Sequence, residues 1–281
     1  WGSRRFWQAI GIAVIAAMQN VYYTNILCQL TLLGAIVLLW RTGSKPAFRS
    51  ALAVVGAAAV TFAVMNLDTW TYRAAHGANP GAFSREYRWL EIYGLKLVDL
   101  VIPPATHHSQ AFARFAIAHR NGAPLQDEGS YLGLVGIAAL ALLVGTAAVD
   151  VIKRRADAIP MAAWQVLWIA ICFSTGGLNA ILGAFGFTLF RTGCRYSIVI
   201  LAIALLYAAQ RLTAWQRKAE TGMTAENFRI AMGTAVAGLG GLVLWDQVPR
   251  APDPQQTATI AAQIEADRQF VEEMESALPP G

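Results

Sequence analysis

The chain has 281 residues, of which 56% are hydrophobic and only 14% are charged, and its mean hydropathy is +0.44. This composition excludes a soluble globular domain of this length and predicts a multi-pass membrane protein. The net charge of +5 does not indicate nucleic-acid binding, because the basic residues are concentrated in short loops between apolar segments. The three cysteines lack paired spacing, so neither a disulfide framework nor a zinc site is indicated.

Seven apolar segments are long enough to cross a hydrocarbon core of about 30 Å. They cover residues 6–20, 24–40, 50–67, 130–149, 161–175, 194–210 and 228–245. A further apolar piece, 178–190, is too short to span, and we expect 174–193 to be a re-entrant segment. The predicted fold is an all-α polytopic membrane protein with about seven transmembrane helices, this re-entrant segment and an interfacial helix.

The predicted segments divide the chain into four parts. Residues 1–67 hold the first three transmembrane helices, and 68–129 form a long loop with the interfacial helix. Residues 130–245 hold the other four transmembrane helices. Residues 246–281 form a proline-rich linker and an amphipathic helix that we expect to lead into a soluble domain absent from this chain. The apolar positions of that helix are Ile260, Ile264, Val271, Met274 and Leu278.

The basic loops predict the orientation of the chain in the membrane. With 178–190 re-entrant, all of these loops share one face, which is then cytoplasmic. The loop 68–129 and the tail 246–281 fall on the opposite, periplasmic face of a bacterial inner membrane. The basic residues are Arg4, Arg5, Arg41, Lys45, Arg49, Lys153, Arg154, Arg155, Arg211, Arg217 and Lys218.

The stretch 85–108, "REYRWLEIYGLKLVDLVIPPATHH", carries charges in an otherwise apolar run. On a helical wheel Arg88, Glu91, Lys96 and Asp99 fall within one arc, and the aromatic residues fall on the other side. The pairs Arg88–Glu91 and Lys96–Asp99 are three residues apart and can neutralise each other. We therefore expect a helix that lies in the membrane interface and ends at the double proline 103–104. It either braces the loop or forms the floor of a site for lipid-linked substrates, with Arg88 facing that site.

Two adjacent histidines, His107 and His108, follow the prolines. Neighbouring side chains point in different directions on most backbones, so a shared metal ion is disfavoured. A histidine there can hydrogen-bond a phosphate or a sugar hydroxyl, or it can be an ordinary solvated loop residue. The sequence specifies no cofactor and leaves a divalent cation open.

Three carboxylates are candidates for a general base, namely Glu86, Asp127 and Glu128. A carboxylate held just above the bilayer can take a proton from an acceptor hydroxyl. The alternative is structural, because Asp127 or Ser130 can cap the transmembrane helix that starts near residue 130.

The segment "LFRTGCRYSI" places Arg191 and Arg195 four residues apart, on one face if the segment is helical. Guanidinium groups hold phosphate oxygens in a two-pronged contact, so the pair would suit the phosphate of a lipid carrier. The alternative is that both side chains reach toward lipid headgroups without a specific partner. Asn179, in the glycine-containing stretch "STGGLNAIL", is expected beside this pair.

Six segments carry a resemblance to a known family, in this order: "QNVYYTN", "EIYGLKLVDLVIPPATHH", "EGSYLGLVGIAALALL", "STGGLNAIL", "LFRTGCRYSI" and "DRQFVEEMESALPPG". Together they resemble the later part of large bacterial GT-C type membrane glycosyltransferases, some of which are labelled phosphoglycerol transferases. The resemblance implies transfer of a sugar from a polyprenyl-phosphate carrier to an acceptor at the outer face, with Arg191 and Arg195 in contact with the carrier phosphate.

In that family the essential acidic residue usually lies in the first outer loop. The corresponding segment here, "QNVYYTN", has no carboxylate. The resemblance therefore implies a catalytic acid or base in a missing N-terminal half or on a partner subunit. Two other functions stay open, a lipid or polysaccharide translocase and a non-catalytic membrane scaffold.

Overall fold

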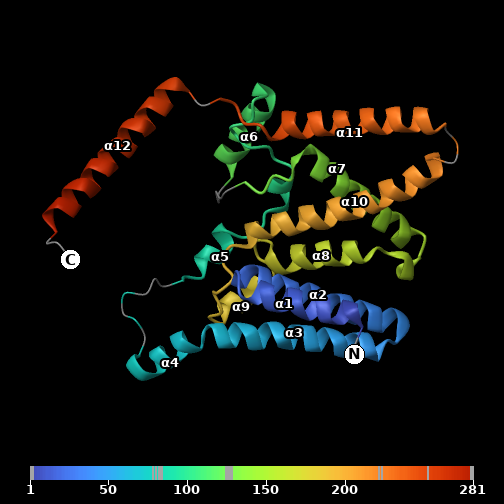
Figure 1. Ribbon diagram of the computed structural model, residues 1–281, viewed down its shortest axis with the longest axis horizontal. Coiled ribbons are helices and arrows are strands. Elements are labelled where there is room, and N and C mark those ends of the chain that lie inside the picture. The colour runs from blue at the N-terminus through green and yellow to red at the C-terminus, as the bar shows by residue number, and fades with distance from the viewer. Residues whose placement is uncertain are drawn as a thin grey trace.

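The computed structural model describes residues 3–77, 79, 81, 85–123, 129–220, 222, 224–251 and 253–278. Within these ranges the regular structure is helical (Figure 1). The main bundle consists of α1 (Arg4–Ala17), α2 (Val21–Thr42), α3 (Lys45–Met65), α7 (Gly133–Ile152), α8 (Met161–Phe173), α10 (Ser197–Glu220) and α11 (Ala225–Gln247). The other helices are α4 (Leu67–His76), α5 (Arg88–Ile92), α6 (Gln110–Gly122), α9 (Leu178–Ala184) and α12 (Pro254–Ala277). Short 3₁₀ turns are η1 (Leu97–Leu100), η2 (Ala156–Ala158) and η3 (Gly193–Tyr196).

Among the described residues, five helical segments are long and apolar enough to cross a membrane. They are Val21–Thr42, Lys45–Met65, Gly133–Ile152, Gly193–Lys218 and Glu226–Gln247. The predicted class, an all-helical multi-pass membrane protein, is confirmed to this extent. Two further bundle helices, α1 and α8, have 14 and 13 residues. At about 1.5 Å per residue they are roughly 20 Å long, which is shorter than a hydrocarbon core of about 30 Å.

The two ends of the bundle differ in character (Figure 1). The start of α1, the α2–α3 turn, the α7–α8 loop and the α10–α11 turn lie at one end, which we call the basic end. The helices α4, α5, α6 and α9 lie at the opposite end, which we call the loop-rich end. The side chain of Arg41 joins two of the basic loops, since its Nη2 donates to the carbonyls of Ala156 (3.3 Å) and Ile159 (2.7 Å). The expectation that the basic loops share one face is met in this arrangement.

Two apolar clusters hold the bundle together. Small residues on α1 and α3, among them Ala13 and Ala58 with no exposed surface, let these helices pack closely. The larger cluster joins α2, α8 and α10 to the loops around η1 and η3. Tyr196 lies in it with no exposed surface, and its hydroxyl donates to the carbonyl of Tyr22 (3.3 Å). The core therefore reaches into the loop-rich end and fixes the loops there.

The prediction of one continuous interfacial helix from about residue 85 to the double proline 103–104 is wrong. Only α5 forms, and the chain then turns at Gly94 before the short η1 turn. The backbone of 93–95 pairs with distant segments instead: Leu95 N donates to Phe173 O (2.8 Å), Thr175 N to Leu95 O (3.2 Å) and Cys194 N to Tyr93 O (2.9 Å). We call this contact of 93–95, 173–175 and residue 194 the backbone junction. A side chain at Gly94 would sit 2.9 Å from the carbonyl of Leu90, so the junction depends on glycine there.

The break at Gly94 also changes the predicted ion pairs, Arg88–Glu91 and Lys96–Asp99, neither of which forms among the interactions that the structure describes. The four residues take other partners: Arg88 pairs with Glu86 (2.7 Å), Glu91 accepts from Tyr87 (3.2 Å), Lys96 donates to the carbonyl of Ile92 (3.0 Å) and Asp99 pairs with His119 (3.1 Å). The helical-wheel argument fails because it assumes one continuous helix.

Candidate functional site

A buried carboxylate, Asp246, lies at the loop-rich end of α11 with only 3% of its surface exposed. Its Oδ1 accepts a hydrogen bond from the hydroxyl of Tyr131 (2.7 Å), and its Oδ2 accepts from Leu134 N (2.9 Å) and Gln247 Nε2 (2.8 Å). Leu134 belongs to the first turn of α7, so Asp246 caps that helix from a distant position in the sequence. Burial, together with the hydrogen bond to Asp246, raises the pKa of Tyr131, which keeps this phenol a donor at neutral pH.

The sequence analysis gave Asp127 or Ser130 as possible caps of this helix, as the structural alternative to a general base. The assignment to Ser130 is wrong, because its hydroxyl donates to the carbonyl of Cys194 (3.4 Å). Asp127 lies outside the described residues. Gly133 explains how the distant carboxylate reaches the helix: it has a positive φ of 76°, and a side chain there would collide with Gln247 and approach Asp246 Oδ2 to 3.0 Å.

His107 is buried beside Asp246, with its Nε2 3.6 Å from Oδ1 of the carboxylate. Its Nδ1 accepts a hydrogen bond from Ser109 N (3.0 Å), so the neutral ring carries its proton on Nε2, toward the carboxylate. The adjacent backbone is held too, since Arg250 N donates to Thr106 O (2.9 Å). His107 was predicted to bind substrate, but this burial indicates that it fastens its loop to the end of α11.

His108 stacks on His107 with ring centroids 4.6 Å apart, and both rings pack against Trp245 in a T-shaped arrangement, with centroids 5.5 Å from it for His107 and 4.9 Å for His108. Nδ1 of His108 lies 3.3 Å from the carbonyl of Val248 and therefore carries a proton. The sequence analysis expected the two neighbouring side chains to point in different directions. Instead, the two histidine rings pack against each other. Among the residues that the structure describes, no group of three histidine, cysteine or acidic side chains could hold a metal ion.

Arg191 and Arg195 lie together at the loop-rich end, but not on one helical face as predicted. Arg191 precedes the 3₁₀ turn η3 and Arg195 lies within it. Each guanidinium covers an aromatic ring instead: Arg191 lies 5.2 Å from the centroid of Trp89, and Arg195 lies 5.9 Å from that of Tyr22. Arg195 is exposed and Arg191 is half-buried. The prediction of a shared face fails because η3 begins only at Gly193.

Three other predicted site residues have clear positions. Asn179 is buried in α9 and donates to the carbonyl of Phe190 (2.7 Å), so it closes the loop that follows α9. Glu86 and Arg88 form an exposed ion pair with each other. Glu128, like Asp127, lies outside the described residues. The described candidates therefore do not form one cluster: Arg88 and Arg191 lie over Trp89 of α5, Arg195 lies over Tyr22 of α2, and the histidines lie near the end of α11.

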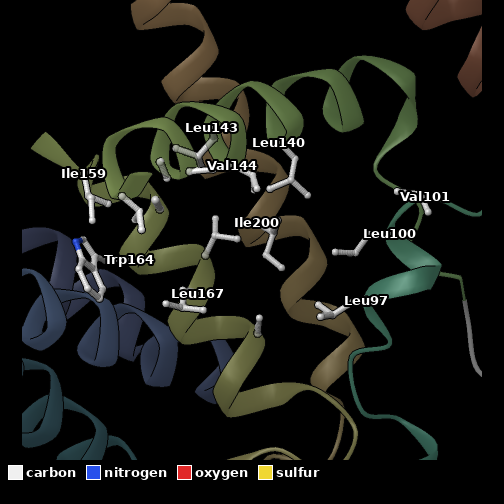
Figure 2. Close-up of a pocket in the computed structure, with 16 residues that line it drawn as sticks. Leu97, Leu100, Val101, Leu140, Leu143, Val144, Ile159, Trp164, Leu167 and Ile200 are labelled. Atoms are coloured by element: carbon white, nitrogen blue, oxygen red, sulfur yellow. The ribbon is translucent and has the colours of Figure 1, made fainter. Parts of the chain in front are cut away.

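An apolar groove of about 540 Å³ runs along α7, α8 and α10. Figure 2 shows Trp164 and Ile159 at one end, and Leu97, Leu100 and Val101 of the η1 region at the other. In the part of the chain that the structure describes, no charged residue lines the groove. The remaining lining residues are Leu140, Leu143, Val144, Ala147, Ala148, Val151, Ala163, Val166, Leu167, Ala170 and Ile200. The groove therefore extends from beside the basic end to the loop-rich end.

The sequence analysis missed this groove because no motif marks it. Its volume arises where the small side chains of Ala147, Ala148, Ala163 and Ala170, on two different helices, leave space between larger ones. Lys96 directly precedes the groove residue Leu97. The ammonium group of Lys96 can donate three hydrogen bonds, and one of them goes to the carbonyl of Ile92 (3.0 Å). The backbone of Lys96 thus adjoins the groove residues at the loop-rich end, whereas its ammonium points toward the carbonyl end of α5.

Comparisons of the chain with protein-family models, with curated proteins and with solved structures gave no match.

Proposed function

We propose that the protein binds the hydrocarbon chain of a lipid-linked substrate in the groove along α7 and α8. The groove itself is the observation that carries the proposal. It lies along α7 and α10, which are long enough to cross a membrane, and along the shorter apolar helix α8. Among the described residues no charged side chain lines it, and its volume of about 540 Å³ falls within the range of ligand pockets, roughly 300–1,000 Å³. Hydrocarbon is the ligand that such a lining favours, because neither side loses a hydrogen bond.

The proposed topology has seven crossings. In it α1 and α8 cross the membrane despite their length, with the connecting loops dipping below the headgroups, and α9 is a re-entrant helix. The basic end faces the cytoplasm of a bacterial cell and the loop-rich end faces the periplasm. This arrangement is supported by the common position of the basic loops and by the seven residues of α9, which extend only about 10 Å.

The substrate headgroup is proposed to lie at the loop-rich end, next to Lys96, Arg191 and Arg195. A phosphate there would meet two guanidinium groups that aromatic rings already hold in place, which lowers the entropy lost on binding. The preferred substrate is a polyprenyl-phosphate-linked sugar, as the resemblance to GT-C type glycosyltransferases implies. This chain then forms the C-terminal membrane portion of such an enzyme.

The proposed reaction is transfer with inversion. The acceptor hydroxyl oxygen bonds to the anomeric carbon while the bond from that carbon to the carrier phosphate breaks, and the phosphate keeps the electron pair. Arginine side chains stabilise the charge on the departing phosphate. A carboxylate takes the proton of the acceptor hydroxyl. Glu86 is the described candidate for this base, and a second chain or a preceding segment is the alternative source.

Binding of undecaprenyl phosphate to the purified protein in nanodiscs tests the headgroup assignment. We expect saturable binding that weakens tenfold or more, about 1.4 kcal/mol, in the variant Arg191→Ala/Arg195→Ala. The matched control is Arg154→Ala/Arg155→Ala at the basic end, which should bind like the wild type. Unchanged binding in the first variant would remove the arginines from the site and leave Lys96 as the headgroup contact. No saturable binding by the wild type would favour the scaffold function.

A further inference from the structure

The helix α12 stands apart from the bundle, and it is exposed along its whole length (Figure 1). Its start is capped, since the side chain of Asp253 accepts from Gln255 N (2.9 Å). Large apolar side chains are exposed on it, with Ile264 at 63% and Leu278 at 66%. An isolated helix gains little stability in water, and exposed apolar rows of this kind are a feature of interaction sites. A partner that covers the apolar side chains would both stabilise α12 as a helix and remove its apolar surface from water.

The spacing of these side chains indicates what kind of element covers them. The apolar side chains Ile260, Ile264, Val271, Met274 and Leu278 are spaced by four, seven, three and four residues. With the polar residues Thr257 and Asp267 counted, the positions alternate at intervals of three and four, which is the heptad repeat of a coiled coil. Such a seam fits the side of another α-helix rather than a sheet edge or a pocket. The seam consists of Thr257, Ile260, Ile264, Asp267, Val271, Met274 and Leu278.

The charge of α12 argues against a membrane surface as the cover. Outside the seam the helix carries Glu265, Glu272, Glu273 and Glu275, against the single basic residue Arg268, which pairs with Glu265 (3.1 Å) and Glu272 (3.5 Å). Anionic lipid headgroups repel such a helix, and helices that bind membrane surfaces are typically rich in lysine and arginine on their polar face.

One seam position, Asp267, restricts the partner further. In a parallel pair of identical helices the two Asp267 carboxylates would face each other as they lose water, and like charges in that position oppose association. A partner with a lysine or arginine opposite Asp267 removes the repulsion. We infer that α12 docks a helix of a different protein. The docked helix has an apolar heptad seam and a basic residue facing Asp267.

Two synthetic peptides of three heptads test this inference on the full chain in nanodiscs. Both have an isoleucine and leucine seam, with lysine opposite Asp267 in one and glutamate in the other. Fluorescence anisotropy should show the lysine peptide binding tenfold or more tightly than the glutamate peptide. The variant Asp267→Lys should reverse that preference, and Ile264→Ser/Val271→Ser should bind neither peptide. All these positions are exposed, so the bundle keeps its fold in each variant.

Three outcomes would overturn the inference. One is equal binding of both peptides by the wild type. Another is self-association of the wild-type protein that Ile264→Ser/Val271→Ser abolishes, which would make a second copy the occupant. The last is binding of α12 to phosphatidylglycerol vesicles in competition with the lysine peptide. None of these results bears on the groove, so this test is separate from that of the proposed function.

Discussion

Replacing Asp246 by alanine is expected to lower the free energy of unfolding by about 3–5 kcal/mol, the usual cost of removing one partner from a buried charged network. The side chain is 2% exposed, so water cannot take its place without opening the packing. The change would leave the Tyr131 hydroxyl, the Leu134 amide and the Gln247 amide without their acceptor, and would remove the carboxylate that lies 3.6 Å from the His107 ring. Denaturant titration in detergent micelles, followed by circular dichroism, measures the loss.

Two variants make this measurement specific. Asp157→Ala removes an exposed carboxylate in η2 and should change stability by no more than about 0.5 kcal/mol. Asp246→Asn keeps the shape but turns an amide donor toward groups that are themselves donors, so its loss should fall between those of the two alanine variants. An Asp246→Ala protein as stable as the wild type would show that the carboxylate does not hold α7, α11 and the histidine loop together.

Gly193→Ala is expected to destabilise the loop-rich end by about 1–3 kcal/mol or more, as overpacking does in a rigid site. The added methyl group would lie 2.5 Å from the carbonyl oxygen of Phe173 and 3.2 Å from Leu95 N. Both neighbours are backbone atoms of the backbone junction, so no rotation of a side chain relieves the contact. To relieve the contact, η3 must move away from Phe173. This movement should also weaken binding of undecaprenyl phosphate, because Arg195 lies in η3 two residues after Gly193.

The matched control is Gly34→Ala in the interior of α2, where the added methyl group meets nothing within 4 Å. Alanine is a better helix former than glycine, so this variant should gain about 0.5–1 kcal/mol. Thermal unfolding of the two variants in the same detergent should therefore shift in opposite directions. Shifts of equal sign and size would mean that the junction is not the rigid contact its geometry indicates.

The bundle helices could be predicted from the sequence because their signal is local. A long apolar run must form its backbone hydrogen bonds within itself in a bilayer, so composition alone locates a helix such as α7, predicted at 130–149 and observed at Gly133–Ile152. The region 85–108 could not be predicted this way. Its conformation is decided by pairing of 93–95 with residues near 173 and 194, and a helical wheel contains no information about such distant partners.

The candidate site shows the same limit. A search near the start of α7 finds Asp127 and Ser130, whereas the carboxylate that meets the helix comes from position 246. The groove depends on alanines of α7 and α8 facing each other, which requires the packing of the helices to be known. The sequence singles out the two arginines by their unusual position in the chain, but it cannot reveal their aromatic partners, Trp89 and Tyr22, which come from segments far away.

The most direct test of the central claim is to fill the groove and measure binding of undecaprenyl phosphate in nanodiscs. The variant Ala147→Phe/Ala163→Phe places two rings in the groove, and Val60→Phe adds a ring at an exposed position of α3 as the control. If the hydrocarbon chain lies in the groove, the double variant binds tenfold or more weakly while the control binds like the wild type. Equal, saturable binding by all three proteins would contradict the account, because the lipid chain would then lie elsewhere.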